Sequence, residues 1–194
     1  MFYKTVSFGL NGLNAFGVSA EIEASKEIPE FQIIGLADAA VKECRERIKS
    51  AFRTSSLAFP EYRIVVNLAP ADVKKSGTVH DLSIAAAICM VQGWISKDQS
   101  DETAFIGEVS LGGEIRSVRG VLPMTILAKE QGCKRVFVPA DNAGEAAVVE
   151  GIEVYPVSDL MGFVLHFLGK KIIEPMPKYI PDFEPKYEKT TSAT

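Results

Sequence analysis

Cysteine and histidine are scarce in this sequence, and their spacing excludes the usual metal and disulfide frameworks. The cysteines are Cys44, Cys89 and Cys133, and none belongs to a Cys-x-x-Cys pair. The histidines, His80 and His166, lie far apart. A zinc site or a disulfide framework needs ligands at closer or paired spacing. We therefore expect no metal site and three buried, reduced thiols, which are typical of a cytoplasmic protein.

Long apolar runs and an excess of positive charge are also missing. No run approaches the roughly 20 apolar residues that span a bilayer. The first ten residues, MFYKTVSFGL, lack the apolar segment of a signal peptide. The formal net charge of −4 excludes a strongly basic nucleic-acid-binding protein, although it allows a local basic stripe. We expect no membrane partner and a cytoplasmic location.

The sequence has no recognisable nucleotide-binding loop. A Walker A loop reads Gly-x-x-x-x-Gly-Lys-[Ser/Thr], because backbone N–H groups and a lysine must surround the phosphates. Residues 74–78 read KKSGT, which are the right residue types in the wrong order. Lys74 and Lys75 are candidates for contact with an anion or a neighbouring subunit, and the alternative is a solvated loop. We expect no cofactor in this chain.

Hydrophobic periodicity predicts a sheet. Alternation of apolar and polar residues indicates strands at 2–8 and 17–24, joined as an antiparallel hairpin. Further strands are predicted at 31–36, 63–68, 104–107, 135–138 and 152–155, with a second hairpin turning at Gly112-Gly113. Because strands alternate with helices from residue 63 onward, the pattern favours an α/β or α+β fold with a mixed sheet.

Capping residues and helical periodicity predict the helices between these strands. Asp38 is expected to cap a helix that runs to about residue 53. Thr78 and Asp81 have the spacing of a capping box before a helix that runs to about residue 91, and His80 is expected at the surface or at this cap. Three later helices are predicted at 121–131, from Asp141 or Asn142 to 150, and from Ser158 to 168.

The end of the sequence differs in composition. The segment EPMPKYIPDFEPKYEKTTSAT contains four prolines, many charges and no apolar periodicity. We predict one domain at 1–172, with two lobes at about 1–60 and 61–172. A proline-rich linker or tail is predicted at 173–194, leading towards a further domain.

One predicted helix carries a basic stripe. Lys42, Arg45, Lys49 and Arg53 lie within a narrow arc beside the apolar face. These four residues are candidates for contact with nucleic-acid phosphates. The alternative is a solvated helix flank, with ion pairs worth about 0.2–0.5 kcal/mol each.

The resemblance to a known family lies in three long segments. They read FQIIGLADAAVKECRERIKSAF, RIVVNLAPAD with KKSGT and HDLSIAAAI, and IGEVSLGGEIRSVRGVLPMTILAKEQGCKRVFVPADNAGEAA. In this order they resemble the amino-terminal domain of the ComM/YifB family of magnesium-chelatase-like AAA+ proteins, over about residues 1–169. The resemblance implies the two-layer α/β fold of the Lon proteolytic domain, which is the ribosomal protein S-five second-domain superfold.

The second half is also similar to the proteolytic domain of Lon proteases and to the Lon-like domain of RadA. In Lon, a serine two residues after a loop glycine is activated by a lysine on a later helix, as a Ser–Lys dyad. The loop glycine corresponds here to Gly77, the serine position to Val79 and the lysine position to Leu122. Aliphatic side chains can neither attack a carbonyl nor accept a proton. The resemblance therefore implies a chain with no catalytic residues.

The family implies a role in a DNA-dependent motor. The chain would be the non-catalytic amino-terminal module of an AAA+ ATPase that acts in branch migration, recombination and competence. Its partners would be its own AAA+ domain, neighbouring subunits of a homo-hexamer, and DNA as a candidate. ATP and Mg²⁺ would belong to the AAA+ domain of the full-length protein. The alternatives are a protein-docking or regulatory module of a magnesium-chelatase-type complex and, more remotely, a degenerate Lon-like hydrolase.

Overall fold

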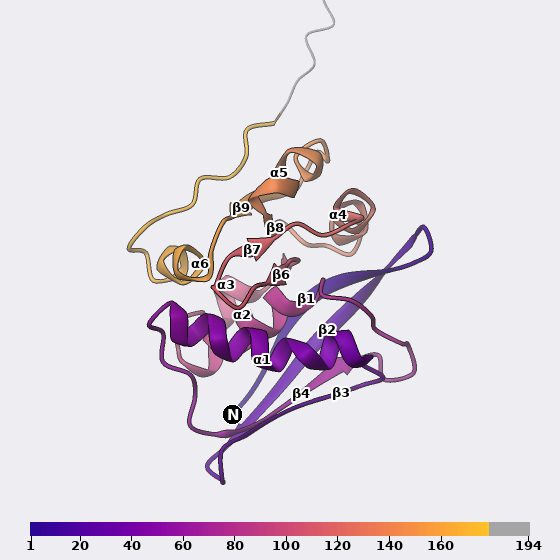
Figure 1. The fold of residues 1–194 in the computed structure, drawn as a ribbon. Helices are drawn as coiled ribbons and strands as arrows, with labels where there is room; N and C mark the ends of the chain where they lie inside the picture. Colours follow the sequence, from indigo (N-terminus) through magenta and orange to yellow (C-terminus); the bar gives the residue numbers. More distant parts are fainter. Residues whose placement is uncertain (179–194) are drawn as a thin grey trace, which may run out of the picture.

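The computed structural model describes residues 1–178, which form one mixed sheet with helices (Figure 1). The seven-stranded sheet has the order β3-β4-β2-β1-β5-β8-β9. Its strands are β1 (Phe2–Asn11), β2 (Asn14–Ser25), β3 (Glu30–Ile34), β4 (Arg63–Ala69), β5 (Thr103–Phe105), β8 (Arg135–Pro139) and β9 (Glu153–Val157). Strand β2 pairs antiparallel with β1 and with β4. The other neighbours pair parallel, namely β3 with β4, β1 with β5, β5 with β8, and β8 with β9. The predicted α/β class with a mixed sheet is confirmed.

Six helices and a small hairpin accompany the sheet within residues 1–178. The helices are α1 (Ala39–Thr54), α2 (Asp81–Val91), α3 (Lys97–Ser100), α4 (Val121–Glu130), α5 (Ala140–Ala146) and α6 (Leu160–Phe167). The hairpin consists of β6 (Glu108–Val109) and β7 (Ile115–Arg116), in agreement with the predicted turn at Gly112-Gly113.

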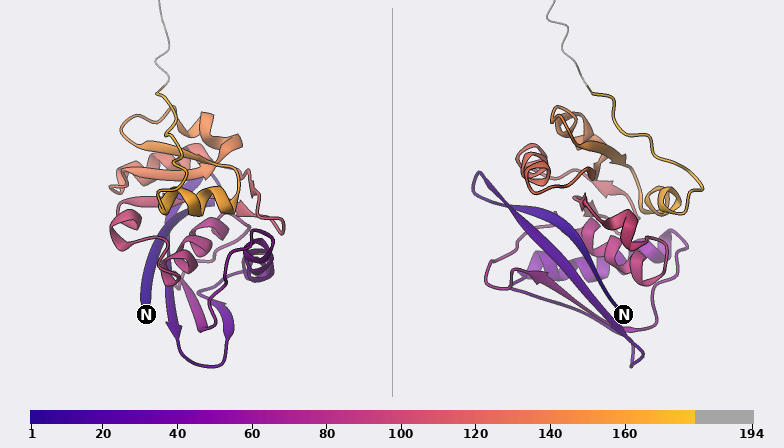
Figure 2. Two further views of the ribbon diagram at one scale, coloured as in Figure 1. Left: turned by 90° about the vertical axis from the view of Figure 1, so that its left-hand side faces the viewer. Right: turned by 180° about the vertical axis from the view of Figure 1, so that it is seen from behind.

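The helices divide between the two faces of the sheet. Phe137 of β8 belongs to a hydrophobic cluster shared with α1, α2 and α6, whereas its neighbours Val136 and Val138 belong to a second cluster shared with α4 and α5. Alternate residues of a strand point to opposite faces. The first cluster therefore lies on one face of the sheet and the second on the other. Figure 2 shows helices on both sides of the sheet. Strand β4, from the second predicted lobe (61–172), lies between β3 and β2 of the first predicted lobe (1–60). One sheet therefore contains strands of both predicted lobes.

The amino-terminal hairpin is confirmed and is longer than predicted. Phe2 pairs with Glu23 at one end and Asn11 with Asn14 at the other. The chain reverses at Gly12-Leu13, where Gly12 has a φ of 63°. Glycine adopts this left-handed backbone without the steric cost that a Cβ brings.

The helix α2 is buried on every side. All of its residues from Asp81 to Val91 are buried. The reason is its position, because it packs on β1 and β2 and also contacts α1 and the β6–β7 hairpin. Cys89 lies in this helix, and it is buried and unpaired, like Cys44 and Cys133, as predicted.

The predicted helix caps are only partly correct. Asp38 caps α1 by accepting a 2.8 Å hydrogen bond from the N–H of Val41, as predicted. The cap of α6 is Asp159, one residue beyond the predicted Ser158. The cap of α5 predicted at Asp141 or Asn142 is wrong, because the helix starts at Ala140 and no side chain caps it. The amide of Asn142 instead bonds the backbone N–H and C=O of Val118.

The capping box predicted for α2 is also wrong. The residue at the N-cap is His80, and its side chain makes no cap hydrogen bond. The carboxylate of Asp81 instead accepts three hydrogen bonds from the guanidinium of Arg47 in α1, at 3.0 to 3.1 Å. It also accepts a 3.1 Å hydrogen bond from the N–H of Val109 in β6. A charged tertiary partner has replaced the local cap.

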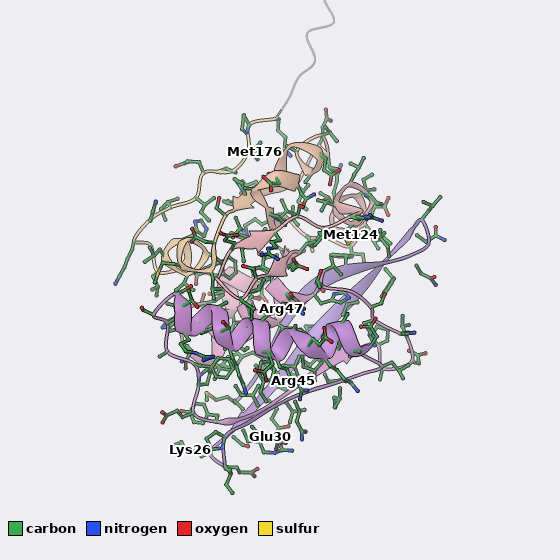
Figure 3. All side chains as sticks on the ribbon, viewed as in Figure 1. Lys26, Glu30, Arg45, Arg47, Met124 and Met176 are labelled. Atoms are coloured by element: carbon green, nitrogen blue, oxygen red, sulfur yellow. The ribbon has the colours of Figure 1, made fainter. Side chains whose placement is uncertain are left out.

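The pair of Arg47 and Asp81 joins α1, α2 and the β6–β7 hairpin. Figure 3 shows Arg47 on the side of α1 opposite to Arg45. The Asp81 side chain is 2% exposed and that of Arg47 is 19% exposed. Burial raises the pKa of Asp81 to about 7, whereas Arg47 and the Val109 N–H lower it. Above this pH the pair is ionised, and the buried carboxylate depends on its cation.

We predict that Arg47→Met lowers the free energy of unfolding by about 3 kcal/mol at pH 8, because it leaves a buried carboxylate without its partner. The loss should shrink as the pH falls from 8 to 7, since the unpaired Asp81 has the higher pKa and takes up its proton first, and it should stay constant below pH 7, where both proteins carry a protonated Asp81. Urea unfolding of both proteins across this range measures the difference. The control is Arg53→Met, an exposed arginine of the same helix, which should cost less than about 0.5 kcal/mol. Equal losses in the two variants would contradict this role of the pair.

Candidate functional site

The two segments that resemble the Lon dyad meet at one surface recess. The recess has a volume of about 370 Å³. It is lined by Leu10, Ser76, Gly77, Thr78, Val79, Ser117, Val118, Arg119 and Met124. The loop before α2 and the segment before α4 thus lie side by side, as the resemblance implies. Val79 and Leu122 both pack against the second hydrophobic cluster.

The chemistry of this recess is limited. Among the described residues that line it, the reactive groups are the hydroxyls of Ser76, Thr78 and Ser117 and the guanidinium of Arg119. A serine or threonine hydroxyl becomes a nucleophile when an adjacent base takes its proton. No carboxylate, imidazole or amine is found among the lining residues that the structure describes. The recess can bind polar groups, but its walls offer no activated nucleophile.

A serine and a histidine do lie together nearby, in the protein interior. The Oγ of Ser7 in β1 and the Nδ1 of His80 are 2.6 Å apart. The exposed fraction is 0% for Ser7 and 1% for His80, so no substrate reaches either group. The sequence predicted His80 either at the surface or at the cap of α2. It occupies the cap position and is not a surface residue. This pair is a structural hydrogen bond across the sheet–helix interface.

Lys75 is buried, and the hypothesis of an anion or subunit contact through it is wrong. Its exposed fraction is 0%. Its ammonium donates to the carbonyl of Gly35 at 2.7 Å and to that of Pro70. Its backbone also bridges to Ala37, so the lysine ties the loop before α2 to the end of β3. Burial lowers the pKa of Lys75. Lys74 is exposed, and for it the hypothesis stays a prediction.

The basic stripe lies on α1, which Figure 2 shows at the edge of the molecule. Lys42 and Arg53 are exposed, whereas Arg45 and Lys49 are partly buried. Arg45 is already engaged, since its guanidinium donates to the carbonyls of Lys42 at 3.1 Å and of Phe31 at 3.3 Å. Three cations therefore remain for a ligand.

An acidic residue shares the face of the stripe. Glu46 is exposed, and it lies four residues after Lys42 and seven before Arg53, which places it on the same side of the helix. It lowers the net positive charge that a phosphate would meet. The sequence could have indicated this reduction through the same helical spacing.

Neither a metal cluster nor a membrane span is present in the described part of the chain. Within residues 1–178, no three His, Cys, Asp or Glu side chains converge as metal ligands would. Every helix there is too short or too polar to cross a bilayer.

The hydrogen-bonded His80 generates a pH prediction. Burial, and secondarily the charge of Lys75, lower its pKa to about 4, while Asp38 opposes the shift. Between pH 6.5 and 4 the unfolded chain binds a proton that the folded protein excludes. The free energy of unfolding should therefore fall on acidification through this window, by up to about 1.4 kcal/mol per pH unit.

The measurement compares urea unfolding of the wild type and His80→Asn at pH 7, 6 and 5. The stability difference between them should narrow as the pH falls, because only the wild type excludes a proton at this position. Asp81 titrates in both proteins, so its contribution cancels in the difference. A difference that stays constant from pH 7 to pH 5 would show that His80 is protonated in the folded protein as easily as in the unfolded chain.

Comparison with known proteins identifies relatives over most of the chain. An uncharacterized protein of Mycobacterium tuberculosis is 37% identical over 157 residues, which cover 81% of this chain and 31% of that protein. The uncharacterized protein YifB of Escherichia coli is 34% identical over 164 residues, covering 84% of this chain and 32% of YifB. The competence protein ComM of Haemophilus influenzae is 33% identical over 160 residues, covering 82% and 31%. The chain spans about a third of the length of the curated relatives it matches.

A more distant similarity supports the fold. Lon protease 2 of Bacillus subtilis is 25% identical over 191 residues, which cover 89% of this chain and 34% of the protease. This similarity and the mixed sheet with its helices agree with the predicted Lon-like fold.

The family described as subunit ChlI of Mg-chelatase matches residues 20–142. This match covers more than half of the chain and includes α1, the loop before α2, the recess segments and the start of α5. The chain therefore belongs to this Mg-chelatase-like family, as a homologue of ComM and YifB.

Proposed function

We propose that this chain is the non-catalytic amino-terminal module of a ComM/YifB-like AAA+ ATPase that acts on DNA in the cytoplasm. The observation that carries the proposal is the similarity to the competence protein ComM over 82% of the chain. Because that relative is about three times as long, ATP and Mg²⁺ would bind outside this module. The module would contribute to assembly of a homo-hexameric ring and to DNA contact.

The composition of the recess supports a non-catalytic role. A Ser–Lys protease needs a hydroxyl and an amine within hydrogen-bond reach of each other. Val79 occupies the serine position, and Leu122 the lysine position. The nearest lysine in the loop, Lys75, is committed to two backbone carbonyls in the interior. A degenerate hydrolase would have to work without any of these groups.

The basic stripe on α1 is the proposed DNA contact. Lys42, Lys49 and Arg53 belong to a helix at the edge of the molecule, whereas Arg45 supports β3. Lysine and arginine bind phosphates and release counterions, which makes such binding weaken as the salt concentration rises. The opposing charge of Glu46 keeps the affinity modest.

A second candidate function is protein docking in a magnesium-chelatase-type ATPase complex. It is favoured by the family match, whose description is a subunit of Mg-chelatase. In that case the stripe would be a solvated flank, and DNA affinity would be absent even at low salt.

We predict that Lys42→Ala/Lys49→Ala/Arg53→Ala weakens DNA binding at low salt by at least about tenfold and reduces the slope of log K against log salt by about three. Glu46→Gln should strengthen binding, because it removes a negative charge from the same face. Fluorescence anisotropy with a labelled duplex and a labelled four-way junction measures both effects. Arg45 is left unchanged, since it bonds the carbonyl of Phe31.

The matched control is Lys4→Ala/Lys97→Ala/Lys170→Ala. It removes the same charge from exposed positions outside α1. An equal loss in the control would mean that DNA senses only overall charge. No binding by the wild type at low salt would reject the DNA contact and favour protein docking.

A further inference from the structure

The segment after α6 is held against the edge of the sheet. It begins at residue 173, inside the predicted linker, and is described up to Lys178, whereas residues 179–194 lie outside the described residues. In Figure 1 it runs from α6 past β9 towards the end of the molecule where α5 lies. We call residues 173–178 the strap. Their contacts with β9 and its neighbours give this part of the predicted linker a defined position.

The middle of the strap bonds the outermost strand. The N–H of Met176 donates to the carbonyl of Val154 in β9 at 2.7 Å. Its side chain packs against the second hydrophobic cluster, beside α5 and β9, where Figure 3 labels it. The flanking residues, Pro175 and Pro177, have no N–H and favour an extended backbone. Met176 therefore supplies the one donor of this tripeptide, and prolines on both sides stop further strand pairing.

The far end of the strap is anchored by a lysine. The ammonium of Lys178 donates to the carbonyl of Val149 at 2.8 Å and to that of Ile152 at 2.5 Å. Both carbonyls belong to the turn between α5 and β9. Burial lowers the pKa of Lys178, while Glu150 and Glu153 oppose the shift. A charged group bound to two carbonyls holds a geometry that a solvated lysine would not.

The near end of the strap is anchored by a histidine. The N–H of Ile173 donates to Nδ1 of His166 in α6 at 2.9 Å. This ring nitrogen must be unprotonated to accept, so the proton of the neutral ring lies on Nε2. Phe137, Tyr155 and Phe167 surround the ring with centroids between 5.1 and 5.5 Å away. Three anchors from α6, β9 and the α5–β9 turn thus hold six residues.

We propose that the edge of β9 and the α5–β9 turn form an interaction surface for the chain's own strap, so that the chain leaves the module from a fixed point at Lys178. A free linker would absorb any movement of the domain attached to it, whereas a docked strap passes that movement to α5 and β9. The inference rests on the proposed function only for the identity of that attached domain, namely the ATPase.

The test is amide hydrogen exchange and ¹⁵N relaxation on this chain in solution. Docking predicts that the N–H of Met176 exchanges at least about a hundredfold more slowly than in a free peptide of the same sequence. It also predicts order parameters for Ile173 and Met176 near the value of about 0.85 of rigid backbone. Lys178→Ala and Met176→Ser should each reduce the protection of the backbone amide at position 176 by at least about tenfold.

The charge-matched control is Lys170→Ala, an exposed lysine whose contact is made by its backbone, and it should leave the protection unchanged. Free-peptide exchange rates and order parameters below about 0.6 in the wild type would overturn the proposal. So would protection that grows with protein concentration together with dimer formation, because the strap would then dock on a second copy. DNA binding by the α1 stripe is measured separately, so a failure of the strap and a failure of the proposed function are distinguishable.

Discussion

The ion pair of Arg47 and Asp81 is the contact on which the arrangement around the recess depends. It joins the middle of α1 to the first residue of α2, and Asp81 also accepts from Val109 in the small hairpin. A buried carboxylate is costly unless it is paired and hydrogen-bonded, so these three elements must come together in one geometry. This geometry fixes the position of α2, and with it the loop that carries Val79.

Lys75 repeats this principle on the other side of the same loop. Its ammonium satisfies carbonyls of Gly35 and Pro70, at the ends of β3 and β4. A lysine in such a loop is typical of an anion-binding site, yet the ammonium of Lys75 binds backbone carbonyls. The recess in front of the loop lies where the resemblance places the Lon dyad, with aliphatic residues at both reactive positions.

The strap and Arg45 bind opposite edges of the sheet. One edge of the sheet, β3, receives the guanidinium of Arg45 from α1, and the other edge, β9, receives the strap. Both contacts occupy backbone groups that would otherwise be open to pairing with another chain. The proposed DNA contact on α1 and the exit of the chain beside α5 therefore belong to different parts of the fold. A ligand bound at α1 and a domain attached after the strap would therefore contact different parts of the module.

The mixed α/β fold, the strands and most of the helices could be predicted from the sequence, because alternation and helical spacing are local properties. The arc of Lys42, Lys49 and Arg53 and the aliphatic residues at the dyad positions were also readable from it. The roles of Lys75, His80 and Asp81 could not be predicted, because they depend on contacts formed in the folded protein. Their partners lie on other elements, and burial made those partners more important than the nearest cap or the solvent. A charged residue next to a helix start looks the same in the sequence whether its side chain faces a ligand or the protein's own backbone.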